Sequence, residues 1–306
     1  MFVHSGFGLI YAKNFCIMDA SAVKLLADLV EIDTHEAAGY HEDKNGKLPQ
    51  MLWKTIGGTR SHHLSTVQRL PSPYSNRVFS TWRCWQKEVK EGNVQYVFGF
   101  VPQSMYNGTV ESIDTQERYV KGDFTGICVI EEVAPQVCSV LWVESANLKT
   151  NLPQAIKILF AKSEMRWANE LQEKYRRHGK VVDKEVGDAL VEKMRDGVEL
   201  SGDLTVVFKE LDDLFGGVDG WKDLESPYAG VDMWIKFQQQ AKGERTIAFG
   251  KFKDMADCSA ENACAWMFEY CSNERMAIDR SEGNLARLEG REGRHGINEK
   301  VRMDES

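Results

Sequence analysis

The residues most able to bind a metal or act as nucleophiles are scattered along this chain. Seven cysteines occur without a CxxC pair, and His35, His41, His62 and His63 show none of the spacings typical of zinc sites. No GxSxG, P-loop, GxGxxG or HExxH motif is present, and no acidic pair stands at a spacing typical of acid–base catalysis. The sequence therefore predicts a protein that is not an enzyme and has no catalytic residues, metal or cofactor.

Chain length and net charge narrow the class of protein further. The chain has 306 residues, enough for about two domains, and 42% of them are hydrophobic. A net charge of −8 argues against a nucleic-acid partner, because phosphate-binding surfaces need an excess of lysine and arginine. No apolar run approaches the roughly 20 residues of a membrane span, and the first residues do not resemble a signal peptide. The odd number of cysteines suits free thiols in a reducing compartment better than a disulfide framework. Together these features predict a soluble cytoplasmic protein.

Several segments predict antiparallel strands. These runs are rich in aromatic and β-branched residues and are separated by short loops; they cover residues 77–87, 94–101, 118–130 and 137–144. From residue 152 the residues of one pattern recur at spacings of three and four, which predicts one face of a long helix. This face carries Leu152, Ile156, Leu159, Phe160, Ser163, Trp167, Leu171 and Tyr175. Strands followed by a long amphipathic helix indicate an α+β fold.

The ends of this helix carry recognisable signals. Thr150 or Asn151 can cap its start, and Pro153 fits its first turn. Gly179 lies just past its end. A short helix near residues 181–194 and a glycine-rich stretch then form a predicted connector.

An internal repeat appears at an offset of 238 residues. Seven identities align without a gap, and the D-x-S-A pattern of Asp19–Ala22 recurs at Asp257–Ala260. In both places the serine or aspartate stands between a strand-like run and a helix-like run, as an N-cap would. Each copy is thus predicted to begin with a strand, a cap and a helix.

Four stretches resemble START (steroidogenic-acute-regulatory-related lipid transfer) domains. Ser75-Asn-Arg-Val-Phe79 resembles the S-x-R-D-F stretch that opens a central strand of that family. Residues 119–132 resemble its V-R strand and the I-E-P-L continuation. Residues 147–153 resemble the D-x-K-G-x-x-P start of its closing helix, and Trp167-Ala-Asn-Glu-Leu171 resembles the F-A-N-x-L found later on that helix.

This resemblance implies a helix-grip fold of the Bet v 1-like superfamily, in which a curved antiparallel sheet wraps a long C-terminal helix and leaves a hydrophobic cavity. It implies a domain at residues 1–178, a helical linker at 179–220 and the N-terminal part of a second, incomplete copy at 221–306. The first copy departs from the second because it lacks the Trp221…Ser226-Pro-Tyr…Val231 start.

The resemblance also implies a set of ligand-binding residues. The family often places an arginine in the cavity, here Arg83. Because strand side chains alternate, it would share a face with Phe79, Thr81 and Trp85, and the closing helix would add Ile156, Phe160 and Trp167. A buried arginine needs a partner; His63 stands where sterol-type members have the acid, and Asp123 is a candidate substitute. The alternative is that Arg83 is an ordinary surface arginine.

The resulting prediction is a non-enzymatic protein that binds or transfers a lipid: a sterol, a phospholipid or a fatty acid. A transient membrane contact and association through the second copy are further predicted partners. The alternative is an interaction or sensor module of a larger signalling protein, with a vestigial cavity. An enzyme of the same broad fold, such as a cyclase or hydrolase, is the least favoured reading.

Overall fold

The computed structural model describes residues 2–6, 9–54, 60–90, 93–106, 119–149, 152–196, 202–216, 220–227, 229–238, 247–269, 272–283, 289–290 and 301–302. The chain divides into two compact units: unit 1, residues Met1–Ala189 with Cys271–Ser306, and unit 2, residues Leu190–Tyr270. Unit 1 thus continues past residue 178, the predicted domain boundary, because the start of the predicted linker packs on it.

Unit 1 is built on an eight-stranded sheet with the order β1-β2-β8-β7-β6-β5-β4-β3. Its strands are β1 (Phe2–Gly6), β2 (Leu9–Met18), β3 (Gln50–Lys54), β4 (Ser61–Gln68), β5 (Arg77–Lys90), β6 (Asn93–Pro102), β7 (Val120–Ala134) and β8 (Val137–Asn147). Neighbouring strands are antiparallel; only the start of β5 also runs parallel to the start of β7. All four predicted strands are confirmed as β5 to β8, in a mixed α+β fold with one large antiparallel sheet.

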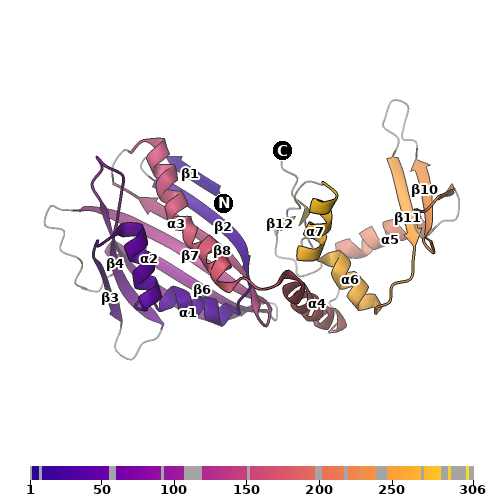
Figure 1. Cartoon of the computed structure of the whole chain (residues 1–306), viewed down its shortest axis with the longest axis horizontal. Helices are drawn as coiled ribbons and strands as arrows, with labels where there is room; N and C mark the ends of the chain where they lie inside the picture. Colours follow the sequence, from indigo (N-terminus) through magenta and orange to yellow (C-terminus); the bar gives the residue numbers. More distant parts are fainter. Residues whose placement is uncertain are drawn as a thin grey trace. The chain divides into compact units, whose positions relative to one another are not determined.

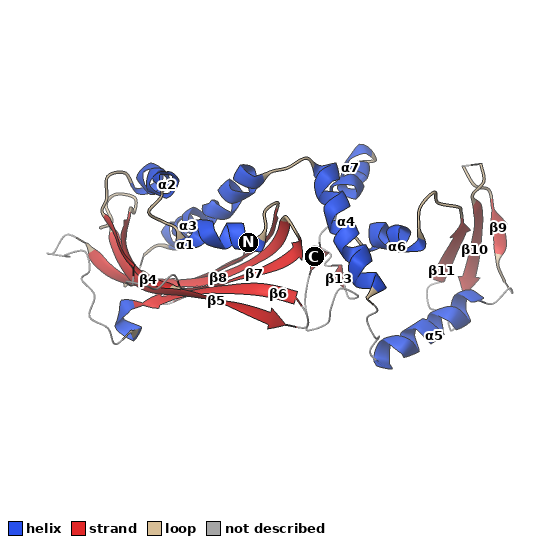
Figure 2. Cartoon of the chain, turned by 90° about the horizontal axis from the view of Figure 1, so that it is seen from below, coloured by secondary structure: helices blue, strands red, loops and turns tan. Residues whose placement is uncertain are grey.

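Three helices lie over one face of this sheet: α1 (Ala22–Val30), α2 (His35–Asn45) and α3 (Gln154–Tyr175) (Figures 1 and 2). The long helix α3 crosses the concave face in the helix-grip arrangement. The predicted helix is therefore confirmed. One assignment to its inner face is wrong, because Leu159 is 52% exposed.

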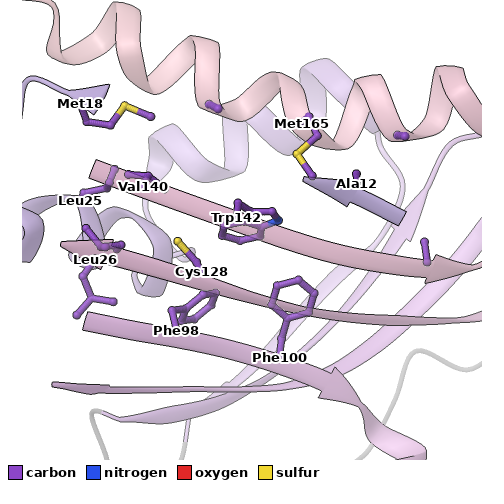
Figure 3. Packing of buried hydrophobic residues seen from close by; sticks show 14 of the residues in the cluster. Ala12, Met18, Leu25, Leu26, Phe98, Phe100, Cys128, Val140, Trp142 and Met165 are labelled. Atoms are coloured by element: carbon purple, nitrogen blue, oxygen red, sulfur yellow. The ribbon is translucent and has the colours of Figure 1, made fainter. Parts of the chain in front are cut away.

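The core of unit 1 fills the space between sheet and helices. Figure 3 shows Phe98, Phe100 and Trp142 projecting from the strands and Met165 from α3. Aromatic pairs join these elements, with 5.6 Å between the ring centroids of Phe100 and Trp142 and 4.7 Å between those of Trp142 and Trp167. Burial of these side chains stabilises each by roughly 1.5–3 kcal/mol relative to exposure.

Side-chain caps begin the first two helices. Ser21 Oγ accepts from Lys24 N at the start of α1, and Thr34 Oγ1 accepts from Ala37 N at the start of α2. Helix α3 begins differently, with Pro153 at the N-cap and no side-chain cap bond. Its predicted caps, residues 150 and 151, lie outside the described residues.

The end of α3 also differs from the prediction. It ends at Tyr175 with Arg176 as its C-cap, and Gly179 instead begins α4 (Gly179–Arg195). A Cβ on Gly179 would lie 2.9 Å from Asn273 Cβ, so the close approach of two chain segments favours glycine there.

Helix α4 is anchored to the β7–β8 hairpin. Val182 packs with Ala134 and Val137 in a small buried cluster. Next to it, Arg177 Nη1 forms a 2.8 Å ion pair with Glu185 Oε2, and Arg177 Nη2 donates to the carbonyl oxygen of Gln136. The first half of the predicted linker is therefore a fixed part of unit 1.

Unit 2 contains a three-stranded antiparallel sheet of order β11-β10-β9, formed by β9 (Lys222–Leu224), β10 (Asp232–Gln238) and β11 (Ile247–Lys253). Its helices are α5 (Gly202–Gly216) and α6 (Ala260–Phe268). Phe215 of α5 packs edge-on against Phe249 of β11, with ring centroids 6.1 Å apart. Beyond unit 2 follow α7 (Asn273–Ser281) and the two-residue strands β12 (Glu289–Gly290) and β13 (Val301–Arg302).

Within the described ranges, no helix combines the length and the apolar character that crossing a membrane requires.

Candidate ligand cavity

A cavity of about 300 Å³ lies within unit 1, between the concave face of the sheet and the helices. Its lining comes from the end of α1, from α2, from the sheet and from α3. Sheet residues that line it include Leu64, Thr66, Phe98, Phe124 and Trp142, while α3 contributes Glu164, Trp167, Glu170, Leu171 and Lys174. The cavity thus lies between the sheet and the helices that cover its concave face.

The lining is more polar than the predicted hydrophobic cavity. Six carboxylates and three cations belong to it: Asp28, Glu31, Glu36, Glu144, Glu164 and Glu170, with Lys44, Arg83 and Lys174. Glu144 is buried, whereas Glu31, Glu36 and Lys174 are exposed. A buried charge persists only where it is paired or hydrogen-bonded. The arrangement of these charges therefore decides what the cavity can hold.

Arg83 lies in the lining, where β5 projects it beside Thr81. Its Nε donates to Thr81 Oγ1 at 3.2 Å, and its guanidinium carbon lies 5.5 Å from the ring centroid of Phe100. Desolvation lowers the pKa of Arg83 to about 10, while the carboxyl groups of Glu164 and Glu144 act in the opposite direction. Arg83 remains charged at neutral pH.

Glu144 is the most unusual titratable group of the cavity. It is 5% exposed, and its Oε2 accepts a 2.7 Å hydrogen bond from Trp142 Nε1. Burial raises the pKa of Glu144 to about 8, and the nearby charge of Glu164 adds to this effect. The Trp142 hydrogen bond and the cations Lys44 and Arg83 only partly oppose it. Glu144 therefore holds a proton at neutral pH.

Two contacts tie α1 and α2 to α3 across the cavity. Lys44 Nζ forms a 2.8 Å ion pair with Glu164 Oε1. Nearer to solvent, Lys174 Nζ lies 2.9 Å from both Asp28 Oδ2 and Glu36 Oε2. The segment that covers the cavity is thus attached to the long helix both inside the cavity and nearer to solvent.

Three predicted residues lie around a smaller adjoining cavity of about 50 Å³. Phe79, Thr81 and Phe160 line it, together with Arg83. The rings of Phe79 and Phe160 lie 5.9 Å apart, centroid to centroid. Trp167 lines the larger cavity, and its buried Nε1 has no hydrogen-bond partner among the described residues.

Neither His63 nor Asp123, the predicted partners of Arg83, lines the cavity. Leu64 and Thr66 of β4 face the cavity, so the alternating His63 faces the other side of the sheet, where its ring lies 6.1 Å from that of Trp82. Asp123 forms an ion pair with Lys149. The carboxyl groups that act on Arg83 are those of Glu144 and Glu164.

Two further predicted ligand-binding residues are core residues and do not line either cavity. Trp85 packs on the main core beside Tyr96, with ring centroids 6.4 Å apart. Ile156 packs against the same core from the start of α3.

Glu144 and Glu164 were missed, although the sequence carries a signal for each. Glu144 continues the inward alternation of Val140 and Trp142 along β8, so an acid occupies a core position of a strand. Glu164 is four residues after Phe160 and three before Trp167, on the inner face of α3, where Ser163 had been placed. Lys44 and Tyr40 were missed because no inward face was assigned to α2.

Several solved structures are similar to this chain. The lipid transfer and protein localization domain of human StarD13 is 12% identical, with a TM-score of 0.41 over 56% of this chain and 80% of that one. Human StAR-related lipid transfer protein 5 is 14% identical, with a TM-score of 0.40 over 57% and 85%. An enzyme also appears: truncated norcoclaurine synthase from Thalictrum flavum, 9% identical, with a TM-score of 0.33 over 56% and 95%.

No curated protein matches the sequence. A family does: residues 43–180 match the START domain. This segment includes β3 to β8, α3 and the deep part of the cavity lining. The lining that comes from the sheet and from α3 therefore lies within the segment that matches the START domain, whereas the lining from α1 and most of that from α2 precedes it.

Proposed function

We propose that unit 1 binds a small hydrophobic or amphiphilic molecule of the lipid class and carries it without chemical change. The observation that carries this proposal is the cavity of about 300 Å³ between the sheet and α1 to α3. Most of its lining lies in the part of the chain that matches the START domain. Ligand sites are concave and partly apolar, with a few fixed polar groups, and this cavity has that composition.

The cavity volume limits the ligand. A volume of about 300 Å³ is at the lower end of the range of roughly 300–1,000 Å³ that ligand pockets occupy. Each buried CH₂ group contributes about 0.8 kcal/mol to binding, so a single chain or a compact ring system supplies useful affinity. Among the predicted classes, this volume favours a single-chain or ring lipid over a two-chain phospholipid.

Native mass spectrometry of the full chain, purified from a lipid-containing host, tests the proposal. We expect a co-purifying mass that is lost on denaturation. A Leu171→Trp variant should reduce it, because Leu171 lines the cavity and the larger side chain fills it. Leu159→Trp is the matched control, since Leu159 lies on the outer side of the same helix and is 52% exposed.

The proposal is wrong if the full chain carries no small molecule and gains none after incubation with a mixture of sterols, fatty acids and phospholipids. It is also wrong if Leu159→Trp and Leu171→Trp lower ligand occupancy equally while both variants keep the wild-type melting temperature.

A second candidate function, protein interaction, is favoured by one observation in unit 2. Its surface exposes large apolar side chains on α5, on the sheet and on α6, including Phe208 at 56%, Phe252 at 66% and Trp266 at 47%. Exposed apolar patches often mark interaction sites. Size-exclusion chromatography with light scattering over a range of concentrations tests whether this unit mediates self-association.

We also propose that residues 221–306 are the opening of a second copy of the fold. Helix starts support this: α6 begins 238 residues after α1, and α7 begins 238 residues after α2. Ser259 and Ser272 cap α6 and α7 as Ser21 and Thr34 cap α1 and α2. The C-caps Glu31 and Glu269 likewise both donate a backbone N–H to an alanine carbonyl four residues earlier.

A further inference from the structure

The inner end of the cavity carries charges that oppose a cationic ligand group. Arg83 and Lys44 are both cations there, and Lys44 is already paired with Glu164 at 2.8 Å. Glu144 is neutral at neutral pH, as argued above. An ammonium group at this end would meet two cations and one ionised carboxylate, without the water that screens charges at a surface.

The opening of the cavity carries charges that oppose an anionic group. Asp28, Glu31, Glu36 and Glu170 all line it. Lys174 is the cation of the lining on this side, and Arg166, outside the lining, pairs with Glu170 at 2.8 Å. Lys174 is already paired with both Asp28 and Glu36 at 2.9 Å. A carboxylate or phosphate must pass or remain beside this acidic rim, where like charges repel it.

Glu144 provides a polar group for a neutral ligand. Its side chain is 5% exposed and lines the cavity, and its one hydrogen bond to a described residue uses Oε2. The charged groups that act on it are Lys44 from α2, Arg83 from β5 and Glu164 from α3, and the indole of Trp142 on β8 donates to it. His41 of α2 lines the same cavity. A protonated carboxyl group donates one hydrogen bond and accepts others.

We propose that the cavity selects an uncharged amphiphile, and that Glu144 is the specificity-determining residue, donating a hydrogen bond to a carbonyl or hydroxyl oxygen at the inner end of the ligand. This inference rests on the proposed binding function and adds the charge of the ligand and the residue that reads it. The buried, unpartnered Nε1 of Trp167 is a second donor in the same lining.

Three probes with ten carbons each test the selection by charge. Calorimetric titration of the full chain at neutral pH should show that 2-decanone binds at least about tenfold more tightly than decanoate or decylamine, because neither cavity end opposes a neutral oxygen. If decanoate or decylamine binds as tightly as 2-decanone or more tightly, the charge selection is wrong, while the proposed binding function stands. If none of the three binds and no lipid co-purifies, the binding function itself fails.

The role of Glu144 has its own test in the pH dependence of 2-decanone binding. The ketone accepts but does not donate, so it needs the proton of Glu144. Wild-type affinity should be constant below neutral pH and fall by up to about tenfold per pH unit above about pH 8. Glu144→Gln keeps an N–H donor without titrating, and its affinity should not change between about pH 6 and pH 9.

Glu144→Leu completes this series because it removes the donor and nearly keeps the side-chain volume. It should lose at least about tenfold in affinity for 2-decanone at neutral pH, at a melting temperature no lower than that of Glu144→Gln. The assignment is overturned if the leucine variant binds as the wild type does, or if the glutamine variant retains the wild-type pH dependence.

Discussion

The two regions that begin alike, β2 to α2 in unit 1 and β11 to α7 further along the chain, differ in what they bury. Helix α1 buries Ala22, Leu25 and Leu26 on one face. The positions 238 residues later are Ala260, Ala263 and Cys264; Ala260 and Cys264 are exposed and Ala263 is half-buried. Helix α6 instead exposes Trp266 and Met267, at 47% and 60%.

The comparison separates local from tertiary causes. Both helices have nine residues, a serine N-cap and a glutamate C-cap. These features depend on residues within one or two turns, so they recur where the sequence recurs. Burial depends on the strands and the long helix that pack against the first copy, and these come from residues 50–175.

The largest expected effect comes from deleting a buried side chain at matched positions. Leu26→Ala should lower the free energy of unfolding of unit 1 by about 2–5 kcal/mol, because Leu26 is 5% exposed in the main core. Its counterpart variant, Cys264→Ala, should change stability by less than about 0.5 kcal/mol. Denaturant unfolding followed by tryptophan fluorescence measures both; equal losses would contradict the difference in burial.

The next largest expected effect is on the pH dependence of stability, and it comes from Glu144, the buried carboxyl group of the cavity. Above the ordinary pKa of 4.5 the unfolded chain releases the Glu144 proton, while the folded protein keeps it up to about pH 8. Stability in the wild type therefore falls as pH rises through this window, and Glu144→Gln removes the loss. The variant should gain about 2–4 kcal/mol relative to the wild type between pH 4.5 and pH 8.

Denaturant unfolding at a series of pH values measures this gain. Glu173→Gln is the control, because Glu173 lies on the exposed side of α3 in an exposed pair with Arg176. A Glu144→Gln curve parallel to the wild-type curve would show that Glu144 ionises normally in the folded protein.

The smallest expected effect tests the serine N-cap that α1 and α6 share. Ser21→Ala and Ser259→Ala each remove a cap bond, to Lys24 N at 3.4 Å and to Asn262 N at 3.2 Å. Each should weaken its own helix by about 1 kcal/mol, because a cap acts on the first turn regardless of what the helix packs against. Hydrogen exchange of the α1 and α6 amides, followed by mass spectrometry, measures this; a loss in one helix alone would break the equivalence.

Much of the fold of unit 1 follows from patterns in the sequence. Strands β5 to β8 and the helix α3 were predicted because alternation and the three–four period report one buried face. The inner face of α3 was assigned with an error at Leu159, since a helical stripe has edges that only the packing partner defines. Beyond the predicted boundary at residue 178, Val182 attaches α4 to a hairpin some 45 residues earlier, and this contact has no signal in the local sequence.

The cavity was harder to predict than the fold. Arg83 was placed in the lining, whereas His63 and Asp123 were chosen as its partners from position in the sequence. The side of a strand to which His63 points depends on the register of β4, in which Leu64 pairs with Thr81. Glu144 and Glu164 approach Arg83 from β8 and α3, more than 60 residues away in the chain.

The sequence by itself determined the strands β5 to β8, the long helix α3 and the cap that stands between β2 and α1. These depend on residues close together in the chain, whose preferences are expressed locally. Only the tertiary structure decided that Glu144 keeps a proton, that Lys44 pairs with Glu164, and that the cavity is charged at both ends. Each of these outcomes depends on desolvation and on charges that chain folding brings together. No single segment of the sequence contains either cause.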